Sequence, residues 1–151
     1  MLLVLSRSRG DGAPAPPYGA PARRPRPERR STPISTAHLV VTLFAALANG
    51  FSGVGAVLRL PAILPGMARA GVPESWLVFP IGTLKLAGAA GLLLGLLGVP
   101  LIGPAAALGL TLYFLCAIGV HVHARDFSAQ FGLAIGFVAL NTATLALALA
   151  S

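Results

Sequence analysis

Four long apolar segments, separated by short polar loops, dominate this chain of 151 residues. They cover about residues 38–58, 75–99, 101–122 and 129–149. Each is long enough for an α-helix to cross a bilayer, which takes roughly 20 apolar residues. Only 10% of the residues are charged, compared with about 25% in an average soluble domain. We therefore predict an all-α fold, an integral membrane four-helix bundle that contacts the lipid bilayer.

Residues 1–36 have a different composition from the apolar part. Residues 13–30 read APAPPYGAPARRPRPERR, and such a Pro-, Ala- and Arg-rich stretch cannot form a core, so we predict a disordered N-terminal tail. The first five residues are apolar and precede Arg7 and Arg9, the reverse of the order in a secretory signal. We therefore expect two parts, a tail at 1–36 and a membrane domain at 37–151 whose first helix acts as an uncleaved insertion signal.

The formal net charge of +7 comes mainly from the tail, because seven of the eleven basic residues precede Ser31. This distribution fits a charge bias across a membrane better than nucleic-acid binding, so no nucleic-acid partner is expected. Five arginines within 23–30 indicate a cytoplasmic N-terminus at the cell membrane, and four crossings return the C-terminus to the cytoplasm. Arg59, Arg69 and Arg125 lie on the opposite side and keep the reverse orientation open.

Motifs for self-contained catalysis are absent from the sequence, which has no phosphate-binding loop, metalloprotease motif or serine nucleophile elbow. A single cysteine excludes an internal disulfide and a CxxC site. His121 and His123 diverge on a helix, so we expect no metal there. His38 lies at the opposite membrane face from both, which excludes a haem held by two histidines. Catalytic residues stay unknown.

The one lysine of the chain, Lys85, lies inside the second apolar segment. An ionisable group there costs roughly 2.5 to 3.5 kcal/mol and usually faces other helices or water. Asn49, Tyr113 and Asn141 lie in the other three segments, and all four residues fall roughly 13 to 15 Å from one membrane face. Helical geometry lets at least Asn49, Lys85 and Tyr113 converge, and it places Asn141 on another side of its helix from Gly132 and Gly136. We predict a ligand site at these three residues; the alternative is hydrogen bonding that only packs the helices.

Small and polar residues at helical spacing predict which faces point toward other helices. The predicted faces are His38, Thr42, Ala45, Asn49, Ser52 and Ala56 in the first segment, Gly88, Gly91, Gly95 and Gly98 in the second, Gly109, Tyr113, Cys116, Val120 and His123 in the third, and Gly132 with Gly136 in the fourth. After the third segment, we expect His123, Arg125 and Asp126 to form a hydrated polar cluster at the lipid head groups.

Two stretches give the chain a family resemblance. Residues 71–96 read GVPESWLVFPIGTLKLAGAAGLLLGL and residues 105–127 read AAALGLTLYFLCAIGVHVHARDF. With Lys85 at the family's lysine position, they resemble the DoxX-like family of small bacterial four-helix membrane proteins over about residues 37–149. That family is named after a membrane subunit of a sulfur-oxidising quinone reductase complex. The chain has no cofactor motif of its own, so we expect no cofactor; the resemblance leaves quinone open as one, together with a membrane redox partner.

Three functions are compatible with these features. The favoured one is a non-catalytic membrane subunit or small-ligand binder with a polar site near the middle of the membrane. The second is a quinone-interacting subunit of a redox complex that meets quinone at Lys85 and Tyr113. The third is a small transporter, which inverted repeats would favour, but none is convincing here. Glycine-rich faces fit a homo-oligomer and internal packing equally well.

Overall fold

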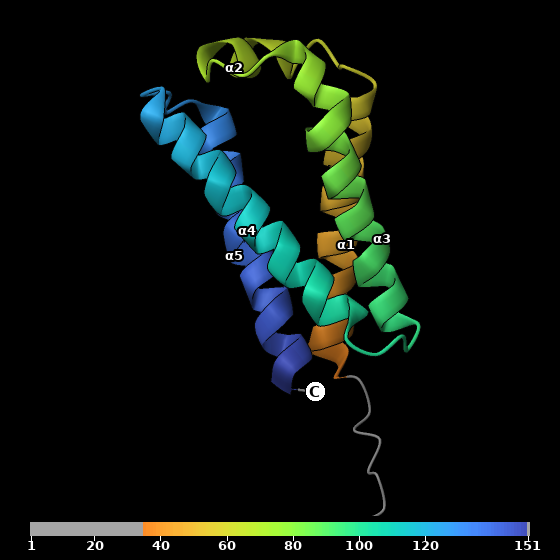
Figure 1. Ribbon diagram of the computed structural model, residues 1–151. Coiled ribbons are helices and arrows are strands. Elements are labelled where there is room, and N and C mark those ends of the chain that lie inside the picture. Colours follow the sequence, from red (N-terminus) through yellow and green to blue (C-terminus); the bar gives the residue numbers. More distant parts are fainter. Residues whose placement is uncertain (1–34, 151) are drawn as a thin grey trace, which may run out of the picture. The chain divides into compact units, whose positions relative to one another are not determined.

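The computed structural model describes residues 35–150, which form helices joined by short turns (Figure 1). The predicted tail lies outside the described residues except for Ser35 and Thr36, which begin the first helix. The elements are α1 (Thr36–Val57), α2 (Leu64–Arg69), the 3₁₀ helix η1 (Glu74–Leu77), the π-helical turn η2 (Val78–Gly82), α3 (Thr83–Leu96), α4 (Ile102–His123) and α5 (Ala129–Ala150).

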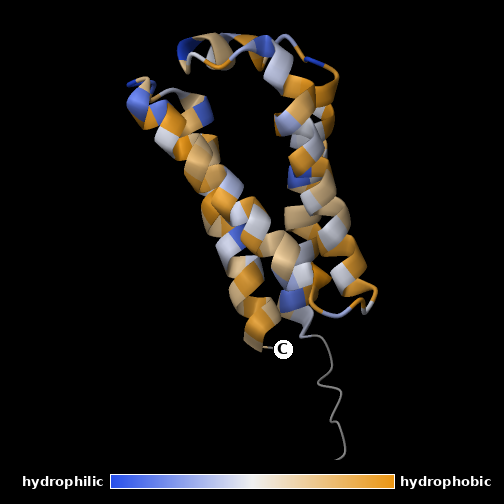
Figure 2. Ribbon diagram, viewed as in Figure 1, coloured by the Kyte–Doolittle hydropathy of each residue, from blue (hydrophilic) through white to orange (hydrophobic). Residues whose placement is uncertain are grey.

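Four helical stretches within residues 35–150 are long and apolar enough to cross a membrane. They are Thr36–Val57, Glu74–Leu96, Ile102–His123 and Ala129–Ala150, close to the predicted segments. Large apolar side chains such as Phe51, which is 80% exposed, cover their outer faces, as contact with lipid requires. Figure 2 shows hydrophobic residues along the long helices and hydrophilic ones gathered near α2. The predicted all-α, four-helix membrane fold is therefore confirmed.

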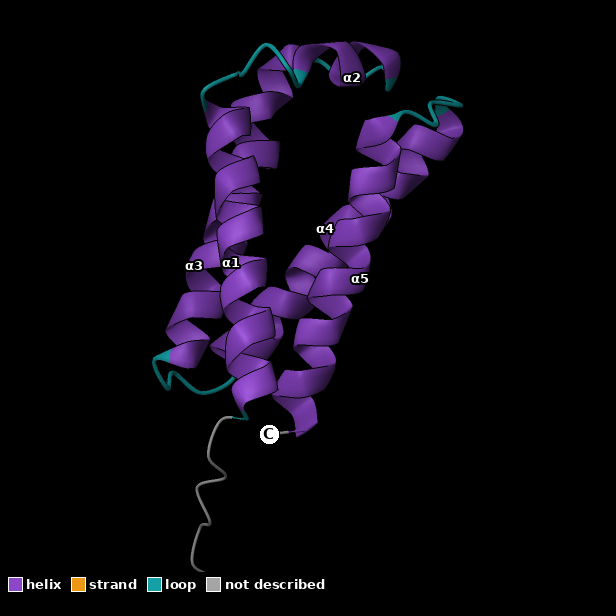
Figure 3. Ribbon diagram, turned by 180° about the vertical axis from the view of Figure 1, so that it is seen from behind, coloured by secondary structure: helices purple, strands orange, loops and turns teal. Residues whose placement is uncertain are grey.

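The long helices associate as two pairs, α1 with α3 and α4 with α5, and α3 packs against α4 at the end away from α2 (Figures 1 and 3). Glycines permit this close approach. A Cβ on Gly91 would lie 2.7 Å from the Cβ of Ala106, and Gly95 faces the backbone of Gly103. Leu92 and Leu110 form the core beside this contact, together with three buried alanines. Gly88, Gly91 and Gly95 of the predicted glycine face therefore pack against α4, whereas a Cβ on Gly98 would meet nothing within 4 Å among the described residues.

Two other faces differ from the prediction. A Cβ on Gly132 or Gly136 would meet nothing within 4 Å, so this pair does not pack inside the chain, and α5 instead buries Ala134, Asn141 and Thr144. On α4 the buried residues are Gly103, Ala107, Leu110, Thr111 and Phe114, which lie beside the predicted face. Small residues indicate where helices can approach closely, but not where they do.

The second membrane span begins irregularly, as Pro80 suggests. Phe79 has non-helical angles (φ −134°, ψ 126°), because a proline after it disfavours the helical conformation there. Thr83 Oγ1 donates a hydrogen bond of 2.8 Å to the Val78 carbonyl across the break. The regular helix α3 starts just beyond it, so Lys85 lies in its first turn. The preceding segment, predicted as a loop, contains the short helix α2.

Candidate functional site

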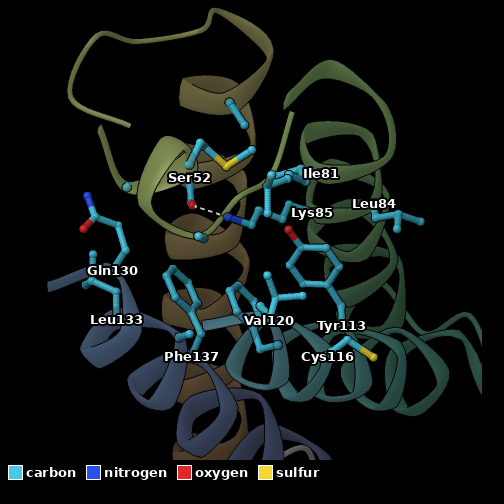
Figure 4. A pocket seen from close by; sticks show the side chains of 18 of the residues that line it. Ser52, Ile81, Leu84, Lys85, Tyr113, Cys116, Val120, Gln130, Leu133 and Phe137 are labelled. Atoms are coloured by element: carbon cyan, nitrogen blue, oxygen red, sulfur yellow. Dashed lines mark hydrogen bonds between the residues drawn. The ribbon is translucent and has the colours of Figure 1, made fainter. Parts of the chain in front are cut away.

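A cavity of about 740 Å³ lies between the two helix pairs, with α2 at one end (Figure 4). Its wall is mostly apolar, with Ile63, Met67, Ile81, Val120 and Leu133 among its residues. Leu84, Gly109 and Tyr113 line both this cavity and a smaller groove of about 270 Å³ beside it. These shared residues belong to α3 and α4, so the cavity and the groove adjoin at the contact between two membrane-spanning helices.

Lys85 supplies the aliphatic ammonium group in the cavity wall. Its Nζ donates a hydrogen bond to Ser52 Oγ at 2.9 Å (Figure 4). Within residues 35–150, the ion pairs join Asp126 to Arg69 and His121, and none involves Lys85. An ammonium has three N–H donors, so Ser52 leaves two of them for the aromatic rings and the cavity.

Three aromatic rings surround the Lys85 amine. Nζ lies 5.2 Å from the ring centroid of Phe114, 5.7 Å from that of Tyr113 and 6.0 Å from that of Phe137. These distances fall within the range of a cation–π contact. Phe114 and Phe137 stack with their centroids 4.5 Å apart, and Tyr113 meets Phe114 edge to face at 4.9 Å. The α4–α5 pair thus holds the aromatic groups that face the lysine of α3.

Lys85 and Tyr113, both predicted site residues, line the same cavity, but Asn49 does not. Asn49 is fully buried, and its Nδ2 donates to the Ala45 carbonyl at 2.8 Å and to Asn141 Oδ1 at 3.0 Å. Asn141 is also fully buried, whereas Gly132 and Gly136 face open space, so Asn141 lies on another side of α5 from this glycine pair, as predicted. The expected convergence of three residues is thus replaced by two pairs, one at the cavity and one inside the helix packing.

The predicted loop cluster also has a different membership. Asp126 is 7% exposed, and its carboxylate lies 2.9 Å from His121 Nδ1 and 3.4 Å from Arg69 Nε. Ser128 Oγ donates to it at 3.0 Å. His123 and Arg125 are exposed and take no part in these contacts. Of the three residues predicted for this cluster, Asp126 alone takes part in these contacts.

Opposing influences act on the Asp126 carboxyl. Its burial favours the neutral acid, but hydrogen bonds from Ser128 and His121 and the positive charge of Arg69 outweigh it and lower its pKa. The carboxylate therefore stays ionised at neutral pH and joins α2 to the α4–α5 loop. Arg69 also donates to Gln130 Oε1 at 3.2 Å, which gives α2 a second polar contact with α5.

Several site residues escaped the sequence analysis. The sequence predicted that Ser52 lies on the inward face of the first segment. It did not predict the hydrogen bond between Ser52 and Lys85. Phe114 and Phe137 resemble lipid-facing aromatics in sequence, and only the crossing of α4 and α5 turns them toward the lysine. Arg69 and Gln130 carried no signal, because their contact depends on how α2 folds over the cavity. Within residues 35–150, no three His, Cys, Asp or Glu side chains lie close enough to hold a metal ion.

The comparisons with known proteins give one positive result. Neither the curated proteins nor the solved structures include a match to this sequence. The sequence matches the DoxX-like family over residues 40–151. That range includes nearly all of α1, the whole of α2 to α5 and every residue named in the cavity. This chain is a multi-pass membrane protein that belongs to the DoxX-like family.

Proposed function

We propose that this protein is a non-catalytic membrane component that binds a small lipophilic molecule in the cavity between its helix pairs. The observation that carries the proposal is the mostly apolar, 740 Å³ cavity with the Lys85 amine in its wall. Sites for small molecules typically measure about 300 to 1,000 Å³ and combine apolar walls with a few placed polar groups. Lys85 and Tyr113 are those groups, and they orient the polar end of the ligand.

The contacts of Lys85 support a binding role over a structural one. A lysine that served only to hold helices together would pair with a carboxylate or fill its donors with protein acceptors. Lys85 instead has one hydrogen-bond acceptor, Ser52, and no ion pair within residues 35–150. Its remaining donors are therefore available to a ligand.

The route to the site runs through the bilayer. Leu84 of α3 and Gly109 of α4 line both the cavity and the groove, and both residues are exposed within the membrane spans. A lipophilic molecule dissolved in the hydrocarbon reaches Lys85 this way without crossing the aqueous phase. We place the protein in the cell membrane, with both termini in the cytoplasm.

A quinone-interacting subunit is the second candidate. The stacked rings of Phe114 and Phe137 lie beside the Lys85 amine, and the Tyr113 hydroxyl adds a second donor to the cavity wall. A quinone ring offers two carbonyl acceptors and a flat face for such a wall. The electrons would come from a partner protein in the membrane.

The test compares what copurifies with two variants. Ala117→Phe adds a ring inside the cavity, which Ala117 lines. Ala139→Phe adds the same ring on an exposed position of α5 outside the cavity. Wild type and both variants are purified in mild detergent, and their organic extracts are analysed by mass spectrometry.

We expect a compound at near-equal molar ratio to the protein in wild type and Ala139→Phe, and its loss in Ala117→Phe. A quinone with its ultraviolet spectrum would select the second candidate. Extracts that contain only bulk lipid, at the same level in all three proteins, would contradict a ligand function for the cavity.

A further inference from the structure

Among the described residues, the cavity lining contains a positively charged side chain and no negatively charged one. Lys85 is its one lysine or arginine within residues 35–150, and no Asp or Glu lines it. The acid next to the lining residue His121 is Asp126, whose oxygens are already engaged by His121, Ser128 and Arg69. The cavity therefore offers a positive charge and no protein carboxylate to balance it.

The neighbours of the amine leave this charge only partly compensated. Ser52 accepts one hydrogen bond, and the three rings lie 5.2 to 6.0 Å from Nζ, close to the outer limit of a cation–π contact. Aromatic faces attract a cation, but they carry no net charge. A buried charge with no counterion is costly, so the strongest stabilisation available to this site is a ligand that brings an anion.

Accepting the proposed ligand function, we propose that the ligand is a lipophilic carboxylic acid whose carboxylate pairs with Lys85. The hydrocarbon part of the acid lies against the apolar wall of the cavity, and its carboxylate receives hydrogen bonds from the free Lys85 donors. A neutral quinone or ester leaves the charge of Lys85 unbalanced, and a phospholipid has a zwitterionic or phosphate head group too large and too polar for the middle of the membrane.

The rest of the cavity suits the hydrocarbon part of such an acid. Along α4, the wall runs from Tyr113 to His121, which spans roughly 12 Å at 1.5 Å per residue. Cys116, Ala117 and Val120 lie between these ends, and Leu133 of α5 also lines the cavity. This length accommodates an aromatic acid or a medium-length alkyl chain.

The chain provides its own reporter for the test. Trp76 is its one tryptophan and lines the cavity. Bromine quenches tryptophan fluorescence at short range, so we would titrate the full-length protein in nanodiscs with a terminally brominated medium-chain fatty acid and with its methyl ester. Competition with the unbrominated acid separates saturable binding from partition into lipid. Lys85→Met removes the charge, and Lys85→Arg keeps it.

We expect the acid to bind wild type at least about tenfold more tightly than the ester, as a charge-assisted hydrogen bond implies. Lys85→Met should reduce this preference to near one, and Lys85→Arg should restore part of it. Equal saturable binding of acid and ester to wild type would overturn the anionic ligand and leave the cavity function intact. Quenching by both compounds with no saturable component would count against the proposed function itself. The acid–ester comparison needs only wild type, so it decides the question even if a variant fails to fold.

Discussion

Lys85 has a single hydrogen-bond partner, Ser52, and no ion pair within residues 35–150. We therefore predict that Lys85→Met leaves membrane insertion and folding intact or improves them, because an ionisable group in the span costs roughly 2.5 to 3.5 kcal/mol. Yield in the membrane fraction and thermal unfolding in detergent measure both. Loss of folded protein would show that Lys85 holds the helices together and would remove the main support for a ligand role.

Unlike Lys85, Asn49 and Asn141 contact each other inside the helix packing, so we expect them to have a structural role. One hydrogen bond of 3.0 Å joins them across 92 residues. Asn49 Oδ1 and Asn141 Nδ2 have no hydrogen-bond partner among the described residues. Replacing either residue with alanine leaves the other buried amide without its hydrogen-bond partner. We therefore expect each single change to lower the free energy of unfolding by about 1 to 3 kcal/mol. The double variant should cost less than the sum, with a coupling of about 0.6 to 1.7 kcal/mol. Denaturant unfolding of the four proteins measures it, and strict additivity would contradict the pairing.

Helix packing at α3 and α4 depends on glycine at particular positions. Gly95 faces the Gly103 backbone so closely that an added Cβ has no room, whereas the site of a Cβ on Gly132 is open. Gly95→Ala should therefore destabilise the α3–α4 contact by about 1 to 3 kcal/mol, as overpacking does in other tightly packed sites. The matched change Gly132→Ala should be neutral or stabilising, because alanine favours a helix by about 1 kcal/mol over glycine. Thermal unfolding of both variants tests the difference, and equal effects would contradict this helix crossing.

The helix α2 depends on the Asp126 carboxylate for its hold on the α4–α5 loop. The pKa of Asp126 is lowered in the folded protein, so its stabilisation is present above its unfolded pKa of about 3.9 and is lost as the pH falls through the lower folded value. Wild type should exceed Asp126→Asn in thermal midpoint from neutral pH down to about pH 4, and the gap should close below it. A gap that stays constant down to pH 2 would show that the carboxylate charge is not what holds the loop.

The same attachment can be tested from α2. Arg69→Gln removes the charge that contacts Asp126, whereas Arg59→Gln changes an exposed arginine outside the cluster. Hydrogen exchange at residues 64–70 should therefore rise in Arg69→Gln and stay at the wild-type level in Arg59→Gln, because local opening follows the loss of local contacts. Equal exchange in the two variants would mean that apolar packing alone holds α2 over the cavity.

For the whole molecule, the sequence predicts those features that are determined within a single segment. Hydropathy and length identify the four spans, and Pro80 marks the irregular start of the second. Contacts between distant segments escape such reasoning. Asn49 and Asn141 are predicted to lie at the same depth in the membrane, but rotation about each helix decides whether they meet. The small residues of α4 indicated a packing face, yet Gly109 and Cys116 line the cavity, because the helix pairs separate there.

Membrane topology is also a property of the whole molecule. An even number of spans places both ends of the bundle's chain on the same side of the membrane. Thr36 and Ala150 lie at one end of the bundle, and α2 and the Asp126 loop lie at the other. Five arginines within 23–30 precede the first span, against Arg59, Arg69 and Arg125 at the far end. Because basic residues close to a span are retained in the cytoplasm, we predict that α2 faces outward. After Cys116→Ser, an impermeant maleimide should label Ala68→Cys in intact cells and should label Ala150→Cys only after lysis. The reverse pattern would show that the charges beyond α1 dominate insertion, and labelling of both sites would contradict four crossings.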